Sequence, residues 1–226
     1  MITRRLIIKT ILVTAICGLW LSGMVSADVP QVTTDIPATH SLVTRVMAGI
    51  GMPDLIINRG ASPHDYSLRP SNAASLETAD LVFWISDRLT PWLEGALTTL
   101  AAGAKVIELL ETETTTVLPY REGTTFETHS HDHKRDEGGH TTIRISDVTA
   151  NVDPHGWLDP DNGKIWLDVI ATELSKKDPE NAGIYFGNAT RGKNQIDAVV
   201  SEIEVTLTAF RGTKFVVYHD AYQYFE

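Results

Sequence analysis

The sequence predicts an α/β fold built on parallel strands. Strand-like and helix-like segments alternate between residues 32 and 109, at a spacing typical of strands connected by helices. The run 81–85 (LVFWI) is apolar at every position, as in a strand buried on both faces of a parallel sheet. A long helical segment at 179–207 then replaces the alternation. We expect this segment to link two lobes rather than to cross over one sheet.

The first lobe is predicted to alternate in a regular order. Apolar residues recur at helical spacing from Leu42 to Ile50, and Gly49 and Gly51 lie near the natural end of that helix. A connection punctuated by glycine and proline follows at 59–70 and is predicted to be a loop. The expected strands are 32–36, 55–57, 81–85 and 105–109, and the second expected helix covers 93–100.

The second half of the sequence departs from this alternation. Residues 111–150 are rich in threonine, glutamate and histidine and are too polar to bury. Helices are predicted at 164–174 and 179–207, and 214–218 (KFVVY) is predicted to open a new strand. The expected parts are a signal peptide at 1–27, an N-terminal α/β lobe at 28–160 with a histidine-rich loop at about 122–146, a helical linker at 161–210, and the start of a C-terminal lobe at 211–226.

The N-terminal residues are typical of an export signal. Arg4, Arg5 and Lys9 precede an apolar run at 11–25. The small residues at 25–27 (VSA) occupy the positions that a signal peptidase recognises, which predicts cleavage after Ala27. A membrane anchor is the alternative, but this run is shorter than the ~20 apolar residues of a spanning helix. We therefore expect an exported protein. The net charge of −10 argues against nucleic acid as a partner, and we expect a monomer.

Three histidines lie in similar local settings. They are His64 in SPHDY, His155 in DPHGW and His219 in VYHDA. Each follows an apolar segment or lies in a Pro/Gly-rich loop, where α/β folds place their ligands, and each has a nearby carboxylate that could orient the ring. Neutral imidazole suits zinc, copper, iron and nickel better than calcium or magnesium. Their wide separation leaves surface histidines as the alternative.

The segments around these histidines resemble one known family. GASPHDYSLRPS at 60–71, followed by ADLVFW at 79–84, is similar to the zinc branch of the metal-binding receptors of ABC importers, the ZnuA-like proteins. The stretches 35–43 (DIPATHSLV), 153–160 (DPHGWLDP) and 219–222 (HDAY), which precedes YFE at 224–226, fit the same family in the same order.

The resemblance implies a fold, a function and a site. The fold has two parallel-sheet lobes joined by a long rigid helix, and the second lobe is expected to be incomplete here. His64 and His155 from the first lobe and His219 from the second would hold Zn²⁺ in the cleft. The function would be high-affinity capture of zinc in the periplasm and its delivery to the membrane permease of an ABC importer, without catalysis. An acidic residue sometimes precedes the first histidine in the family; Pro63 stands there, so no ligand is carried over.

Secondary roles are expected for several other residues. His129, His131, His133 and His140 alternate with acids and are predicted to gather metal weakly, since zinc-type members carry such loops. His40 is expected to cap a helix or to support the site from behind, and Asp65 and Asp220 could orient the rings beside them.

Two other functions stay open at this stage. A zinc hydrolase could use the three histidines, an open water position and Glu226 or Asp220 as a base. A metal-binding adhesin or manganese receptor of the same fold is the second. Family members continue beyond the third histidine to a carboxylate that approaches the metal, so we expect a fragment whose fourth ligand is water or another group. Binding should weaken below about pH 6, as the imidazoles protonate.

Overall fold

The computed structural model describes residues 29–121 and 151–226. Its centre is a four-stranded sheet in the order β2-β1-β3-β4. The strands are β1 (Val32–Thr34), β2 (Asp54–Leu55), β3 (Leu81–Trp84) and β4 (Lys105–Glu108). All neighbouring strands are parallel. The predicted α/β class is therefore confirmed.

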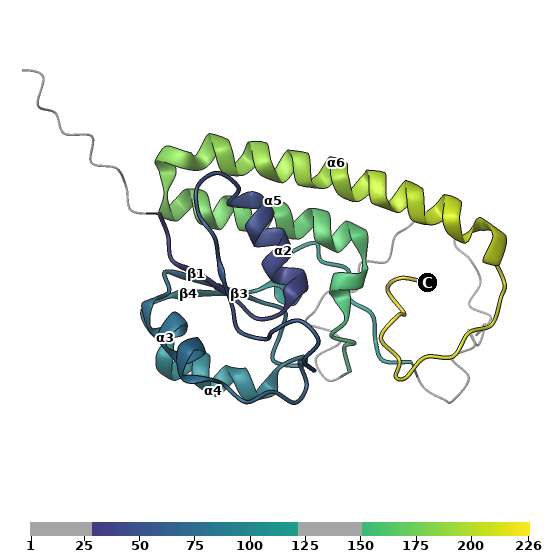
Figure 1. Cartoon of the computed structure of the whole chain (residues 1–226), viewed down its shortest axis with the longest axis horizontal. Helices are drawn as coiled ribbons and strands as arrows, with labels where there is room; N and C mark the ends of the chain where they lie inside the picture. Colours follow the sequence, from purple (N-terminus) through teal and green to yellow (C-terminus); the bar gives the residue numbers. More distant parts are fainter. Residues whose placement is uncertain (1–28, 122–150) are drawn as a thin grey trace, which may run out of the picture.

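Helices cover both faces of this sheet (Figure 1). Helices α3 (Pro70–Thr78) and α4 (Pro91–Leu100) lie on one face. Helices α2 (Pro37–Val46), α5 (Pro160–Lys177) and α6 (Ala182–Leu207) lie on the other and pack against one another. The described residues also form short 3₁₀ helices: η1 (Leu109–Glu111), η3 (Gly156–Leu158), η4 (Pro179–Asn181) and η5 (Thr208–Phe210).

Proline marks the start of four of the five described α-helices. Pro37, Pro70, Pro91 and Pro160 are the first residues of α2, α3, α4 and α5. A proline suits this position because its fixed φ is already helical and its missing N–H would have no partner inside the helix. Pro70 ends the predicted loop at 59–70, and helix α3, which begins at this residue, was not predicted.

Helix α5 and the first half of α6 belong to the packed core of this lobe. Trp166, Leu167, Ile170 and Leu174 of α5 are fully buried. The buried residues of α6 all lie between Tyr185 and Gly192, and the second half of the helix extends past the sheet (Figure 1). The predicted linker at 161–210 thus packs largely with the first lobe. The division into two lobes stays a prediction.

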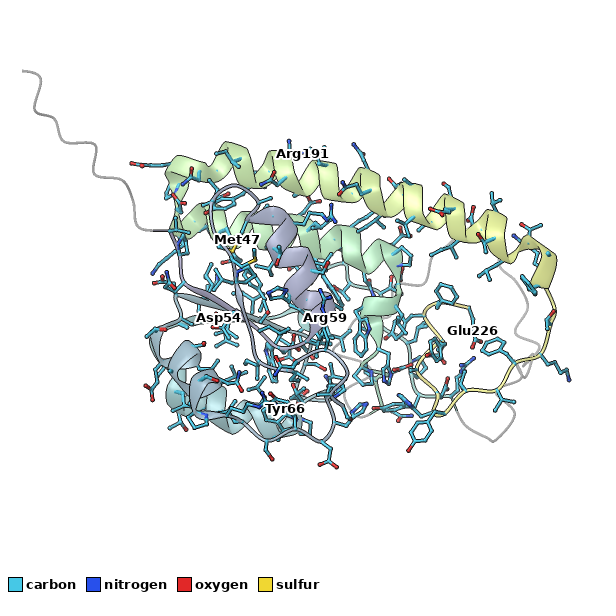
Figure 2. All side chains as sticks on the ribbon, viewed as in Figure 1. Met47, Asp54, Arg59, Tyr66, Arg191 and Glu226 are labelled. Atoms are coloured by element: carbon cyan, nitrogen blue, oxygen red, sulfur yellow. The ribbon has the colours of Figure 1, made fainter. Side chains whose placement is uncertain are left out.

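The C-terminal segment contradicts one predicted element. Residues 214–218 form no strand, and Val216 and Tyr218 are 98% and 103% exposed. A run of apolar residues forms a strand only where a neighbouring strand supplies hydrogen bonds, and 214–218 pairs with no strand among the described residues. After leaving α6, the chain loops back and ends at Glu226, beneath the far half of α6 and to the right of the sheet in this view (Figures 1 and 2).

Two further predictions concern residues that the structure does not describe. The signal peptide at 1–27 and the histidine-rich loop, at about 122–146, lie outside the described residues. Within 29–121 and 151–226, no helix is both long and apolar enough to pass through a membrane.

Candidate metal centre

The structure brings the three predicted histidines together. His64 lies in the loop between β2 and α3, His155 immediately precedes η3, and His219 lies in the C-terminal segment after α6. One ring nitrogen of each lies within 4.8 Å of the other two. His155 is buried, whereas His64 and His219 are exposed, so the cluster opens to solvent on one side.

The spacing of these nitrogens suits a small tetrahedral cation. Nε2 of His155 and Nε2 of His219 are 3.3 Å apart. Zinc–nitrogen bonds of about 2.0–2.1 Å at tetrahedral angles place two ligand nitrogens about 3.3 Å apart. The His64 ring lies 5.7 Å from that of His155 and 6.0 Å from that of His219, measured between centroids. Three nitrogens in this arrangement leave the fourth tetrahedral position for another group.

His155 is oriented by Asp153. The Asp153 carboxylate oxygen Oδ1 lies 2.6 Å from Nδ1 of the His155 ring and also accepts a hydrogen bond of 3.0 Å from the backbone N–H of His155. Both side chains are almost completely buried. A proton on Nδ1 leaves the Nε2 lone pair free to face the cluster, and a carboxylate behind a ligating histidine raises its basicity.

Packing behind His155 fixes its backbone. A Cβ atom at Gly156 would lie 2.7 Å from Cδ1 of the buried Leu110. The side chain of the buried Asn162 donates to the carbonyls of Gly156 and Thr116 and accepts from the N–H of Thr116. The short turn that carries His155 is therefore held against η1 and the start of α5.

His64 is held through the loop that precedes it. Nε1 of Trp92, on α4, donates a 2.8 Å hydrogen bond to the carbonyl of Pro63. The Trp92 ring also packs against Tyr66, with centroids 5.6 Å apart. Partial burial lowers the pKa of His64. The charges of protonated His155 and His219 lower it further, and a backbone hydrogen bond with Leu89 opposes these effects. A lowered pKa favours the neutral imidazole that a metal requires.

His219 reaches the cluster because the last residues of the chain pack on the first lobe. The hydroxyl of Tyr224 accepts from the N–H of Leu118 at 2.8 Å and donates to the carbonyl of Asp153 at 2.9 Å. The side chain of Gln223 donates to the carbonyl of Pro119 at 2.9 Å. The C-terminal segment is thus attached beside the carboxylate that orients His155.

The other predicted residues lie elsewhere. Nε2 of His40 is 3.1 Å from the carbonyl of Pro53 and Nδ1 is 3.4 Å from the Thr44 hydroxyl, so this ring ties α2 to the segment before β2. Asp220 pairs with Arg121 rather than with an imidazole, and Asp65 is exposed. His129, His131, His133 and His140 lie outside the described residues. Asp153 was foreseen only as one of several flanking carboxylates, and Arg121 and Trp92 were not foreseen as partners of the site.

Comparison with known families is decisive. The family model of ZnuA, the periplasmic component A of the zinc-uptake complex, matches residues 32–226. The chain belongs to the ZnuA family. The high-affinity zinc uptake system protein ZnuA of Paracoccus denitrificans is 42% identical over 224 residues, which cover 88% of this chain and 64% of that protein. The protein of the same description from Brucella abortus is 36% identical over 226 residues, covering 93% and 66%.

Solved structures share the fold. A zinc-bound ZnuA deletion mutant superimposes with a TM-score of 0.68 at 23% identity, covering 88% of this chain and 66% of that one. The chain spans slightly less than two thirds of the length of these ZnuA proteins. The histidine cluster therefore lies within the part of the ZnuA fold that this chain represents.

Proposed function

We propose that this chain captures zinc as cargo through His64, His155 and His219. The observation that carries the proposal is the convergence of three ring nitrogens within 4.8 Å of one another, from three separate segments of the chain. The ligand set favours zinc over manganese, because imidazole is softer than the oxygen ligands that manganese prefers. Water or another group completes the tetrahedron, since the three histidines occupy only three of its corners.

Membership of the ZnuA family extends this proposal to transport. The relatives are described as proteins of a high-affinity zinc uptake system, and the family as a periplasmic component of a zinc-uptake complex. We propose that the chain acts in the periplasm as a monomer and passes zinc to the membrane permease of an ABC importer. Export is tested by sequencing the N-terminus of the secreted protein, which is expected to begin at Asp28 after cleavage of residues 1–27.

The contacts of the nearby carboxylates favour binding over catalysis. Asp220 and Glu226, the bases that a hydrolase would need, both form ion pairs with Arg121. All four carboxylate oxygens of these two residues accept hydrogen bonds from the guanidinium, so both groups are engaged in attaching the C-terminal segment. We propose that the chain is not an enzyme; turnover of ester or amide substrates that depends on added zinc would contradict this.

The zinc site is tested by competitive titration of the full chain against a chelator. One tight equivalent is expected, and His64→Ala, His155→Ala and His219→Ala should each weaken it. His40→Ala is the matched control, because His40 is bound to the Pro53 carbonyl and lies outside the cluster. Tight binding that survives loss of all three histidines would overturn the proposal.

The histidine-rich segment is proposed to add weak sites only. Deleting residues 127–141 removes His129, His131, His133 and His140 together. The tight equivalent should remain, and weaker additional equivalents should disappear. Loss of the tight equivalent in this deletion would reverse the order of importance of the two clusters.

A further inference from the structure

His219 lies in a segment that has no regular secondary structure of its own. After η5 ends at Phe210, the described chain forms only turns and bends up to Glu226. Tyr218, immediately before His219, is fully exposed. Neither a helix nor a strand therefore sets the direction of the His219 side chain, and tertiary contacts of its neighbours must do so.

Arg121 makes a charged contact of this kind. Its guanidinium pairs with both carboxylate oxygens of Asp220, the residue next to His219, through Nη2 and through a 2.9 Å hydrogen bond from Nε. It also donates to Glu226 at 2.6 Å and 3.2 Å. The side chains of Arg121 and Asp220 are 19% and 17% exposed, so water screens this pair only partly. A two-point guanidinium–carboxylate pair fixes orientation as well as distance.

Arg121 is itself attached to the part of the chain that orients His155. Residues 118–121 run antiparallel to 151–153, with a bridge between Pro119 and Val152. The N–H of Tyr120 donates to the carbonyl of Asn151 at 3.0 Å, and the N–H of Asp153 donates to the carbonyl of Leu118 at 2.8 Å. One short ladder therefore carries Asp153, which holds His155, and Arg121, which holds the neighbour of His219.

We propose that Arg121 is a positioning residue that sets His219 at the metal centre through Asp220 and Glu226. The inference rests on the proposed zinc site and adds to it a residue distant in sequence from all three histidines. Two carboxylates offset the positive charge of the guanidinium, so Arg121 can lie beside a cation site without repelling the cation.

The test is a double-mutant cycle in the full chain with zinc as the probe. Arg121→Gln should weaken zinc binding about 10- to 100-fold, the usual cost of losing a group that supports a metal ligand. Arg121→Lys, which keeps the charge but loses the two-point geometry, should weaken it less. In a His219→Ala background, Arg121→Gln should have no further effect, because the group that it positions is gone.

Cobalt spectroscopy separates positioning from a general loss of structure. The visible spectrum of bound Co²⁺ reports the number and geometry of its ligands, and the spectrum of Arg121→Gln should match that of His219→Ala. Lys164→Gln is the control, because Lys164 also pairs with two carboxylates, Asp161 and Asp197, neither of which belongs to the histidine cluster or contacts Arg121 in the described ion pairs. The control should leave both affinity and spectrum unchanged.

The outcomes distinguish the inference from the proposed site. If His219→Ala weakens zinc binding but Arg121→Gln does not, the inference fails and the site stands. If His219→Ala has no effect, the site itself fails. An equal loss from Arg121→Gln with and without His219 would also overturn the inference, since Arg121 would then act on the whole fold. If Arg121→Gln shows no thermal unfolding transition like that of the unaltered chain, it has not folded. The effect of Arg121→Lys on zinc binding, measured with and without His219, then replaces it as the test.

Discussion

Replacing Asp153 by alanine is expected to weaken zinc binding while leaving all three histidines in place. Asp153 accepts two hydrogen bonds from His155, one from the ring and one from the backbone. Without this acceptor, the ring can rotate or carry its proton on Nε2, the nitrogen that faces His219. Either change removes one ligand from the cluster for part of the time.

The size of the effect follows from the burial of the pair. His155 is 4% exposed and Asp153 1% exposed, so water cannot readily replace the lost acceptor. Leaving a buried donor unsatisfied costs about 1–3 kcal/mol. A loss of this size in the binding free energy raises the dissociation constant roughly 5- to 150-fold. This range overlaps the effect of removing a group that is hydrogen-bonded to a metal ligand.

The assay is competitive titration of zinc against a chelator of known affinity, at fixed pH and salt. Asp153→Asn is the matched variant, because its amide oxygen can still accept a hydrogen bond from the ring but carries no charge. Its zinc affinity should fall less than that of Asp153→Ala. Thermal unfolding of the metal-free variants checks that the fold persists. An affinity of Asp153→Ala equal to that of the unaltered chain would refute the role given to Asp153.

Three other predictions follow from the described packing and charges. Gly156→Ala should lower the free energy of unfolding by about 1–3 kcal/mol, because the new methyl group would collide with the buried Leu110; unchanged denaturant unfolding would contradict this. Burial and the neighbouring imidazoles lower the pKa of His64, so an NMR titration of the metal-free chain should find its ring neutral at a pH where an ordinary histidine is partly protonated. Burial raises the pKa of Asp35 from 3.8 to about 6, so its contribution to stability is complete below about pH 4 and falls by about 3 kcal/mol as the pH rises from about 4 to about 6. Asp35→Asn should remove this fall from the pH profile of chemical unfolding, and identical profiles would count against it.

The sequence predicted the two central strands, β1 and β3, well because they are buried throughout. Leu81–Trp84 is buried at every position, and an apolar run of that kind is visible without knowledge of any partner. Helix α3 was harder to detect, because only Asn72 and Leu76 among its residues are buried and no apolar stripe marks it. The strand predicted at 214–218 was wrong, because strand formation depends on a neighbour that a local pattern cannot reveal.

The candidate site was predictable in part for a similar reason. Each of the three histidines stands in a recognisable segment, so the resemblance to a family could select them from eight histidines in the chain. Asp153 precedes His155 by two residues and belongs to the same segment. Arg121 is separated from Asp220 by 99 positions, and no local pattern joins them. Contacts of this length become visible only when the chain is folded.

The most direct test of the account is X-ray absorption at the zinc edge on the zinc-loaded chain. Three imidazole nitrogens at about 2.0–2.1 Å and one further light ligand are predicted, with two imidazoles after His219→Ala. Fewer than three imidazoles in the unaltered chain, or the same number after His219→Ala, would contradict the claim that His64, His155 and His219 bind one zinc ion together.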